Sequence, residues 1–285
     1  MVERIEMQVG CKVTTANAVV RLPVWLDSFI FDELHARYAP SCMNMTVIDW
    51  GREDILRYLG TYFPRSFAES YSIFSSYFAQ SKYLSSKKSL SVFDFGCGTG
   101  GELIGLLMAL QEQSDRAMPI KVHALDGNIH AVRILERIIE KFRKVSNVNV
   151  EMRLAPLTID DFYDLDVIRN VLHEGCDVFL TFKAICEFVT KEQFERRNPY
   201  THVLKTFRPW LNSGAITCLA DITTYNDTVR EWLPKMMDKG VVDACFQVLG
   251  RNGGFNEAFS VSHSRRICDQ SKIAWRLLAN KEATI

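Results

Sequence analysis

The stretch SVFDFGCGTGGE, residues 91–102, decides the fold. Its first half is an apolar run that is typical of a β-strand and contains one acid, Asp94, and its second half has glycines at positions 96, 98, 100 and 101. So many glycines between a strand and a helix allow the backbone to approach a nucleotide closely. The stretch therefore predicts a nucleotide-binding turn, and the remaining question is which nucleotide it binds.

Strands and helices alternate after this turn. Apolar strand-like runs occupy residues 91–96, 120–127, 148–155, 176–182 and 215–223. Segments with a helical pattern of apolar residues lie between the first of these runs. This alternation indicates parallel strands joined by right-handed crossovers. Two last runs, 257–265 and 272–279, have little between them and read as an antiparallel hairpin. We predict an α/β fold with a doubly wound, Rossmann-like sheet of seven strands that ends in an antiparallel hairpin.

The first 88 residues have a different pattern of apolar residues. Residues 22–38 and 50–80 have helical spacing, and the second region is rich in aromatic residues and is interrupted at Pro64. Those aromatic side chains either pack against the core or close over a ligand. We expect a helical N-terminal cap over residues 1–88 and an α/β domain over residues 89–285.

Composition narrows the classes of partner. The 285 residues include 34 basic and 34 acidic side chains, so the formal net charge is zero and no overall field attracts nucleic acid or an anionic membrane. No apolar run is long enough to span a bilayer, and the N-terminus lacks the apolar segment of a signal peptide. The eight cysteines are scattered without a C-x-x-C pair, which argues against a metal site and favours the reducing cytoplasm.

Two glycine spacings coincide in the turn. Positions 96, 98 and 101 match the G-x-G-x-x-G pattern of dinucleotide-binding proteins, and positions 96, 98 and 100 match G-x-G-x-G after an acid. A pyrophosphate in this turn would be repelled by Asp94, whereas the ammonium of the methionyl group in S-adenosylmethionine would be attracted. An NAD-dependent oxidoreductase stays an alternative, because Asp94 can instead cap the turn.

The segment VFDFGCGTG, residues 92–100, resembles the first motif of the class I S-adenosylmethionine-dependent methyltransferases, and HALDGN, residues 123–128, resembles their second. The resemblance extends over residues 89–279. It implies S-adenosyl-L-methionine as methyl donor, S-adenosyl-L-homocysteine as product and a methyltransferase domain at 89–285. In the family the acid of the second motif holds both ribose hydroxyls, which is the role implied for Asp126. An NAD enzyme also places an acid there, so Asp126 alone does not discriminate.

The resemblance also implies a cofactor site. Leu157 packs on the adenine, and Asp160 or Asp161 accepts from its amino group, unless Thr158 and Asp161 cap the next helix. An N-terminal helix offers Arg65, with Tyr71 behind it, to the methionyl carboxylate, unless Arg65 is a surface residue. The expected cofactor-binding residues are Asp94, Gly96, Cys97, Gly98, Gly100, Asp126, Gly127, Asn128, Leu157, Phe182, Arg65 and Tyr71.

Methyl transfer depends mainly on positioning, and it needs a general base only when the acceptor loses a proton. The segment TFKAICEF, residues 181–188, stands where DNA-amino and glutamine methyltransferases carry an Asn-Pro-Pro-Tyr motif, which argues against those acceptors. Lys183 and Glu187 are four residues apart and share a helix face, either in an acceptor pocket or as an exposed ion pair. Further candidate bases are His263, beside Arg265 and Arg266, and the less favoured His173 and His202.

The expected methyl acceptor is a small molecule, with a peptide or protein as the second choice and RNA as the third. Nothing in the sequence indicates the oligomeric state. A second alternative is a catalytically silent scaffold that binds S-adenosylmethionine. Residues 62–74 and 177–188 distantly resemble the methyltransferase-like proteins of mitochondrial small-subunit ribosome assembly. The clustered cysteines that would hold the iron–sulfur cluster of that group have no counterpart in this sequence.

Overall fold

The computed structural model describes residues 18–40, 50–114, 118–159, 161–172, 174–188, 197–226, 230–252 and 255–280. Its helices are α1 (Val24–Ser28), continued by a π-helical turn at Phe29–Glu33, α2 (Arg52–Gln80), α3 (Gly101–Gln113), α4 (Ile129–Val145), α5 (Ile185–Phe188), α7 (Pro199–Phe207) and α8 (Leu233–Asp243). Short 3-10 turns lie at Leu84–Ser86, Asp166–Asn170 (η4) and Arg208–Trp210 (η5). The strands are β1 (Val20–Arg21), β2 (Leu90–Phe95), β3 (Ile120–Asp126), β4 (Val150–Pro156), β5 (Cys176–Phe182), β6 (Leu211–Asp221), β7 (Tyr225–Asn226), β8 (Glu231–Trp232), β9 (Phe246–Arg251), β10 (Glu257–His263) and β11 (Arg266–Asn280).

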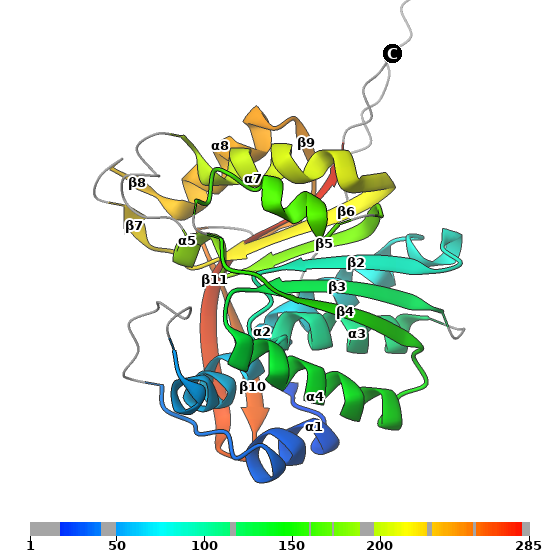
Figure 1. Ribbon diagram of the computed structural model, residues 1–285, viewed down its shortest axis with the longest axis vertical. Coiled ribbons are helices and arrows are strands. Elements are labelled where there is room, and N and C mark those ends of the chain that lie inside the picture. Colours follow the sequence, from blue (N-terminus) through cyan, green and yellow to red (C-terminus); the bar gives the residue numbers. More distant parts are fainter. Residues whose placement is uncertain are drawn as a thin grey trace, which may run out of the picture.

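One mixed sheet organises the molecule (Figure 1). The strands run in the order β1-β10-β11-β6-β5-β2-β3-β4, with β9 paired to β11 beside β10, and pairing is parallel from β4 through β6. The strand β11 is antiparallel to both β6 and β10, which confirms the predicted terminal hairpin. The sheet has nine strands where seven were predicted, because the short β1 and β9 join it.

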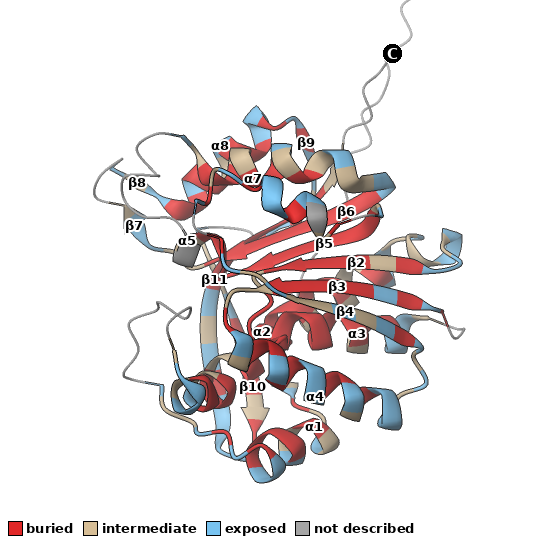
Figure 2. Cartoon of the chain, viewed as in Figure 1, coloured by how far each residue is buried: buried red, intermediate tan, exposed pale blue. Residues whose placement is uncertain are grey.

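Helices cover both faces of the sheet. In Figure 1, α2, α3 and α4 lie below the strands and α7 and α8 lie above them. Successive side chains of a strand point to opposite faces, so Val92 packs into the core below and Phe93 into the core above. Figure 2 shows the central strands buried along most of their length and the outer side of α4 exposed.

The helix α2 runs without a break through Pro64, so the predicted interruption is wrong. A proline inside a helix removes one backbone hydrogen bond, at a cost of about 3 kcal/mol. The buried side of α2, which includes Ile55, Leu59 and Phe63, offsets that cost by packing in the core below the sheet. Residues 22–38 are only partly helical, because the chain leaves the helical conformation after Glu33 and His35 has a positive φ of 60°.

The backbones of α2 and α3 approach closely at two glycines. A methyl group added at Gly101 would lie 2.6 Å from the carbonyl oxygen of Phe63, and one added at Gly105 would lie 2.5 Å from that of Phe67. Both distances are shorter than van der Waals contact. Gly101 and Gly105 are four residues apart and therefore form a flat strip on one side of α3, which receives α2.

The N-terminal segment is attached to the terminal hairpin. Residues 266–273 of β11 pair only with β10, beyond the part of β11 that pairs with β6, and Figure 1 shows this extension reaching toward α1. The strand β1 pairs with β10, and the Asp27 carboxylate accepts hydrogen bonds from the backbone and the hydroxyl of Ser264. The division at residue 88 stays a prediction about which part folds by itself. Of the described helices, none combines the length and the apolar character needed to cross a membrane.

Candidate cofactor site

The turn between β2 and α3 has the backbone that its glycines allow. The φ angles are 73° at Gly96, 48° at Gly98 and 82° at Gly100, all in the left-handed region that favours glycine. The N–H groups of Gly96 and Cys97 donate to the carbonyl of Leu125 at 2.9 and 3.0 Å, which ties the turn to the end of β3. The turn therefore lies at the carboxyl edge of the parallel strands, where open α/β sheets bind ligands.

Asp94 is fully buried beside this turn, and neither of its carboxylate oxygens has a hydrogen-bond partner among the described residues. It points to the same face of β2 as Val92, toward α2 and α3. Burial and the neighbouring Asp126 raise the pKa of Asp94 well above its ordinary value. A capping role for Asp94 would need a backbone donor, and none reaches its oxygens. A buried carboxylate without a donor is costly, so this position calls for a cationic or hydrogen-bond-donating group.

Asp126 ends β3 opposite the turn. One of its oxygens accepts from the N–H of Gly98 and the other from the N–H of Asn128, both at 2.8 Å. Burial raises its pKa, while these two donors lower it in part. Each carboxylate oxygen has a second acceptor site, and Asp126 is only half-buried, so it can still accept from a ligand. After Gly127, Asn128 caps α4 through its side-chain oxygen, which accepts from His130 and Ala131.

Aromatic residues from the N-terminal region cover the glycine turn. A methyl group added at Gly98 would lie 3.4 Å from the hydroxyl of Tyr58 on α2. The Tyr58 ring contacts the rings of Trp50 and Tyr62, with centroids 5.8 and 5.1 Å apart. The carbonyl of Trp50 also accepts from the side chain of Asn128. The sequence reasoning missed Tyr58 and Trp50, and their only signal was the aromatic richness of this region.

Lys183 leaves β5 in an unexpected conformation. Its φ is 55°, an uncommon value for a residue with a side chain, and it precedes α5, so the predicted shared helix face with Glu187 is wrong. The expected alternative, an exposed ion pair, is also wrong, because Lys183 is only 6% exposed. Its ammonium instead binds the buried Glu69 of α2 at 2.7 Å. The side chain of Glu187 lies outside the described residues.

Arg65 and Tyr71 do not reach the glycine turn. The guanidinium of Arg65 binds both oxygens of Asp269 on β11, at 2.7 and 2.8 Å, and Tyr38 donates to the same carboxylate at 3.1 Å. The hydroxyl of Tyr71 donates to Glu112 at 2.5 Å, which places it roughly 16 Å along α3 from Gly101. Both predictions are corrected because these side chains are bound to carboxylates elsewhere.

His263 lies in the extension of the hairpin. Its ring stacks on Phe31 with centroids 5.2 Å apart, and its Nδ1 accepts from the N–H of Arg265. Its Nε2 is buried and has no partner within the described part of the chain, and burial lowers the pKa of His263. The structure therefore places this candidate base in the contact with the N-terminal segment and away from the glycine turn.

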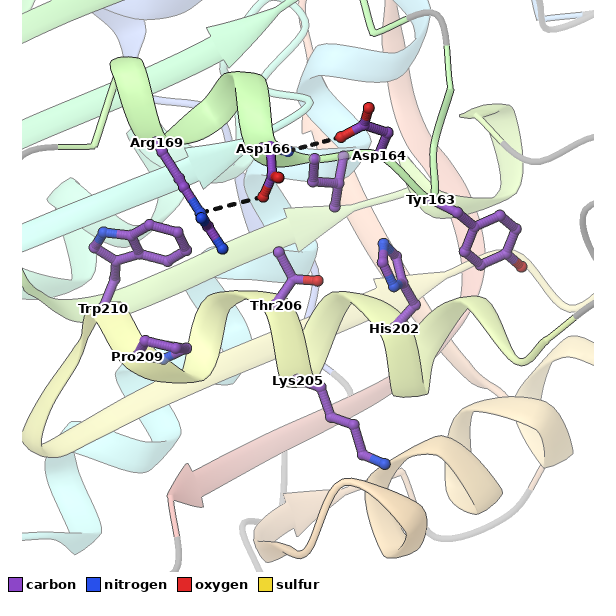
Figure 3. A pocket seen from close by; sticks show the side chains of 10 residues that line it. Tyr163, Asp164, Asp166, Arg169, His202, Lys205, Thr206, Pro209 and Trp210 are labelled. Carbon is purple, nitrogen blue, oxygen red and sulfur yellow. Dashed lines mark hydrogen bonds and ion pairs between the residues drawn. The ribbon is translucent and has the colours of Figure 1, made fainter.

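A separate groove of about 510 Å³ lies between η4, α7 and η5 (Figure 3). Its lining includes His202, another candidate base, whose ring is 4.9 Å from that of Tyr163. Burial and Arg197 lower the pKa of His202. None of the residues of the glycine turn lines this groove, so His202 belongs to a different surface.

The structure gives the positions of most of the other residues that were predicted for the cofactor site. Phe182 is buried at the end of β5, and Cys97 is buried in the turn, where burial raises the pKa of its thiol. The N–H of Leu157 donates to the carbonyl of Asp126, which keeps Leu157 beside the site. Asp161 accepts from the N–H of Tyr163 in a local turn, without the Thr158 capping box that was the alternative. Asp160 and His173 lie outside the described residues.

Several solved structures resemble this one. A protein of Listeria monocytogenes assigned to the class I S-adenosylmethionine-dependent methyltransferases is 11% identical, with a TM-score of 0.47 over 84% of this chain and 72% of that chain. Magnesium protoporphyrin IX methyltransferase of Synechocystis, with bound S-adenosylmethionine, is 14% identical, with a TM-score of 0.44 over 90% and 94% of the two chains. An S-adenosylmethionine-dependent methyltransferase of Aquifex aeolicus is 14% identical, with a TM-score of 0.42 over 81% and 100%.

The chain has a Rossmann-like α/β fold, in which a mostly parallel sheet ends in antiparallel strands. No protein-family model and no curated protein sequence matches it. At such low identities the similarity concerns the arrangement of strands and helices, and the role of each residue has to come from the geometry of this chain.

Two further charged residues escaped the sequence reasoning. Glu69 is fully buried and pairs with Lys183, and Glu102 is 5% exposed and interacts with Asp94, Lys183 and Glu69. Glu69 had a detectable signal, because it precedes the buried Ile73 by one helical turn and so places a carboxylate on the apolar side of α2. Among the described residues, no three His, Cys, Asp or Glu side chains gather in a way that could hold a metal ion.

Proposed function

We propose that this protein is a methyltransferase that uses S-adenosyl-L-methionine as methyl donor and leaves S-adenosyl-L-homocysteine as product. The observation that carries the proposal is the buried Asp94 carboxyl group, which lies beside a glycine turn of left-handed geometry and has no hydrogen-bond partner in the described part of the chain. A dinucleotide would bring a pyrophosphate to this turn, and its negative charge would oppose the ionisation of Asp94. The ammonium of a methionyl group would instead supply the missing donor, directly or through a water molecule.

The residues around the turn fit this donor. Asp126 can accept from two neighbouring ribose hydroxyls, because each of its oxygens has an acceptor site left. Leu157 follows β4 at the same edge and offers an apolar contact for a base. Tyr58 lies over Gly98, whereas Arg65 and Tyr71, which were expected near the methionyl carboxylate, bind Asp269 and Glu112. When bound, the donor would supply an activated methyl group, so the protein has mainly to orient the donor and the acceptor.

A thermal-shift experiment tests the donor. S-adenosylhomocysteine at about 100 times its Kd should stabilise the native state by about 2.7 kcal/mol and raise Tm by several degrees. NAD at the same concentration should leave Tm unchanged, because Asp94 opposes its pyrophosphate. A larger shift with NAD than with S-adenosylhomocysteine would refute the proposal and favour an oxidoreductase.

The variant Asp126→Ala tests the ribose contact. Hydrogen bonds to a charged group contribute on the order of 1.5–3 kcal/mol each, so we expect the affinity for S-adenosylhomocysteine to fall tenfold or more in calorimetry. The variant Asp164→Ala is the control, because Asp164 lines the separate groove between η4, α7 and η5 and should keep the affinity of the unmodified protein. Equal affinity in a folded Asp126→Ala variant would exclude Asp126 from the site.

We propose a small molecule as the methyl acceptor, with a peptide or protein as the second choice and RNA as the third. We propose that the protein acts in the cytoplasm. The six described cysteines form no disulfide with one another, which supports a reducing compartment. A silent scaffold that binds the donor without turnover is the rival. Incubation with methyl-labelled donor and cell extract distinguishes the two, because only an enzyme transfers label to an extract component and loses that transfer with Asp126→Ala.

A further inference from the structure

Four buried charged side chains gather below the glycine turn. They come from four separate elements: Asp94 from β2, Glu102 from the first turn of α3, Glu69 from α2 and Lys183 from the end of β5. Their exposed fractions are 0%, 5%, 0% and 6% in the same order. Burial, Asp94 and Glu69 raise the pKa of Glu102, and Lys183 lowers it, so these groups interact through space.

The cluster contains three carboxyl groups and one ammonium, and no described cation other than Lys183 belongs to it. Lys183 donates to one oxygen of Glu69 at 2.7 Å, and the other oxygen of Glu69 is buried and finds no partner among the residues that the structure describes. Both oxygens of Asp94 also lack a partner. Glu102 gains some stabilisation from the N-terminus of α3, which leaves Asp94 and Glu69 as the unsatisfied acceptors.

We propose that this acidic cluster makes the site select the positively charged methyl donor over its product. The inference rests on the proposed function. S-adenosylmethionine carries a positive sulfonium that S-adenosylhomocysteine lacks, and the excess of carboxyl groups attracts that charge in a water-poor environment. A metal ion is a poor candidate for the same role, because the described residues form no cluster that could hold one.

The selection requires that the carboxyl groups ionise when the cation binds. Without ligand, burial and mutual repulsion raise the pKa values of Asp94 and Glu102, so these groups hold protons at a pH where an ordinary carboxyl does not. Burial also raises the pKa values of the neighbouring Asp126 and Cys97. A cation lowers the carboxyl pKa values, and the released protons pass to the buffer. Affinity for the cation therefore rises with pH, while affinity for the uncharged thioether changes less.

Calorimetry with three probes tests this selection. The probes are S-adenosylmethionine, S-adenosylhomocysteine and sinefungin, in which a protonated amine replaces the methyl group and keeps the positive charge. We expect both cations to bind at least tenfold more tightly than S-adenosylhomocysteine. Titrations in buffers of different ionisation enthalpy should show proton release with the cations and less with S-adenosylhomocysteine.

The variant Glu102→Gln removes one charge and keeps the size of the side chain. It should reduce the preference for the cations at least threefold and leave the affinity for S-adenosylhomocysteine within twofold. The control Glu112→Gln makes the same change on the same helix, at the carboxylate bound to Tyr71, and should alter neither affinity.

The outcomes separate the two proposals. If S-adenosylhomocysteine binds as tightly as the cations, or if the cations release no protons, the selection is refuted while the donor assignment stands. If none of the three probes binds, the proposed function itself fails. The proton measurement uses the unmodified protein, so it decides the question even if Glu102→Gln does not fold.

Discussion

The variant Lys183→Met should lose about 3–5 kcal/mol of unfolding free energy, the usual cost of leaving one partner of a buried ion pair without the other. Lys183 is 6% exposed and its ammonium lies 2.7 Å from a Glu69 oxygen that is fully buried. Methionine fills much of the same space, so the loss comes from the unpaired Glu69 carboxylate and not from a cavity. Chemical denaturation monitored by circular dichroism measures the effect.

Two further variants give this prediction its controls. Lys121→Met breaks the pair between Lys121 and Glu174, in which both side chains are 51% exposed, and should cost less than about 1 kcal/mol. Lys183→Met combined with Glu69→Leu removes both buried charges and should recover most of the lost stability. If Lys183→Met is as stable as the unmodified protein, the pair with Glu69 does not hold α2 against the end of β5.

The double variant Gly101→Ala/Gly105→Ala should lose about 2–5 kcal/mol of unfolding free energy. Overpacking a close contact costs about 1–3 kcal/mol, and one outward movement of α2 relieves both contacts in part, so the two costs are not fully additive. The added methyl groups would lie 2.6 and 2.5 Å from backbone carbonyl oxygens of α2, which cannot turn away as a side chain can. The same movement should draw Tyr58 from Gly98 and weaken donor binding.

The variant Gly51→Ala is the control for a glycine-to-alanine change in this region. Gly51 precedes α2, has an extended backbone and has no atom of the described residues within 4 Å of an added methyl group. Its stability should stay within about 0.5 kcal/mol of the unmodified protein. Unchanged stability of the double variant would show that α2 does not rest directly on the backbone of α3.

The correct predictions of the fold rest on patterns among residues that are close together in the sequence. The run from Val92 to Gly100 specifies strand, turn and helix start in nine positions, and the short connection between β10 and β11 specifies their pairing. Asp94 and Asp126 could be predicted for the candidate site for the same reason, because each is fixed by the strand that it ends or nearly ends. The periodicity of the strands and their polar ends were sufficient signals.

The errors concern residues whose partners are distant in sequence. Lys183 was paired with Glu187 at helical spacing, but its partner Glu69 is 114 residues away. Arg65 was assigned to the cofactor, but its partner Asp269 is 204 residues away. A charge on an apolar helix face indicates that a partner exists, yet only the tertiary packing decides which opposite charge comes within reach. The wrong prediction of an interruption at Pro64 has the same origin, because the tertiary packing of α2 outweighs the tendency of proline to break a helix.

The contact between Arg65 and Asp269 has a consequence for synthesis on the ribosome. At ~5–20 residues per second, Asp269 is added 10–40 s after Arg65, because 204 residues separate them. During that interval β1, Tyr38 and Asp27 also lack their partners, all of which belong to β10, β11 or the turn between them. During this time the N-terminal segment of the nascent chain therefore exposes apolar side chains such as Phe31, whose partner His263 has not yet been made. A chaperone that binds nascent chains should hold this segment until the last hairpin emerges.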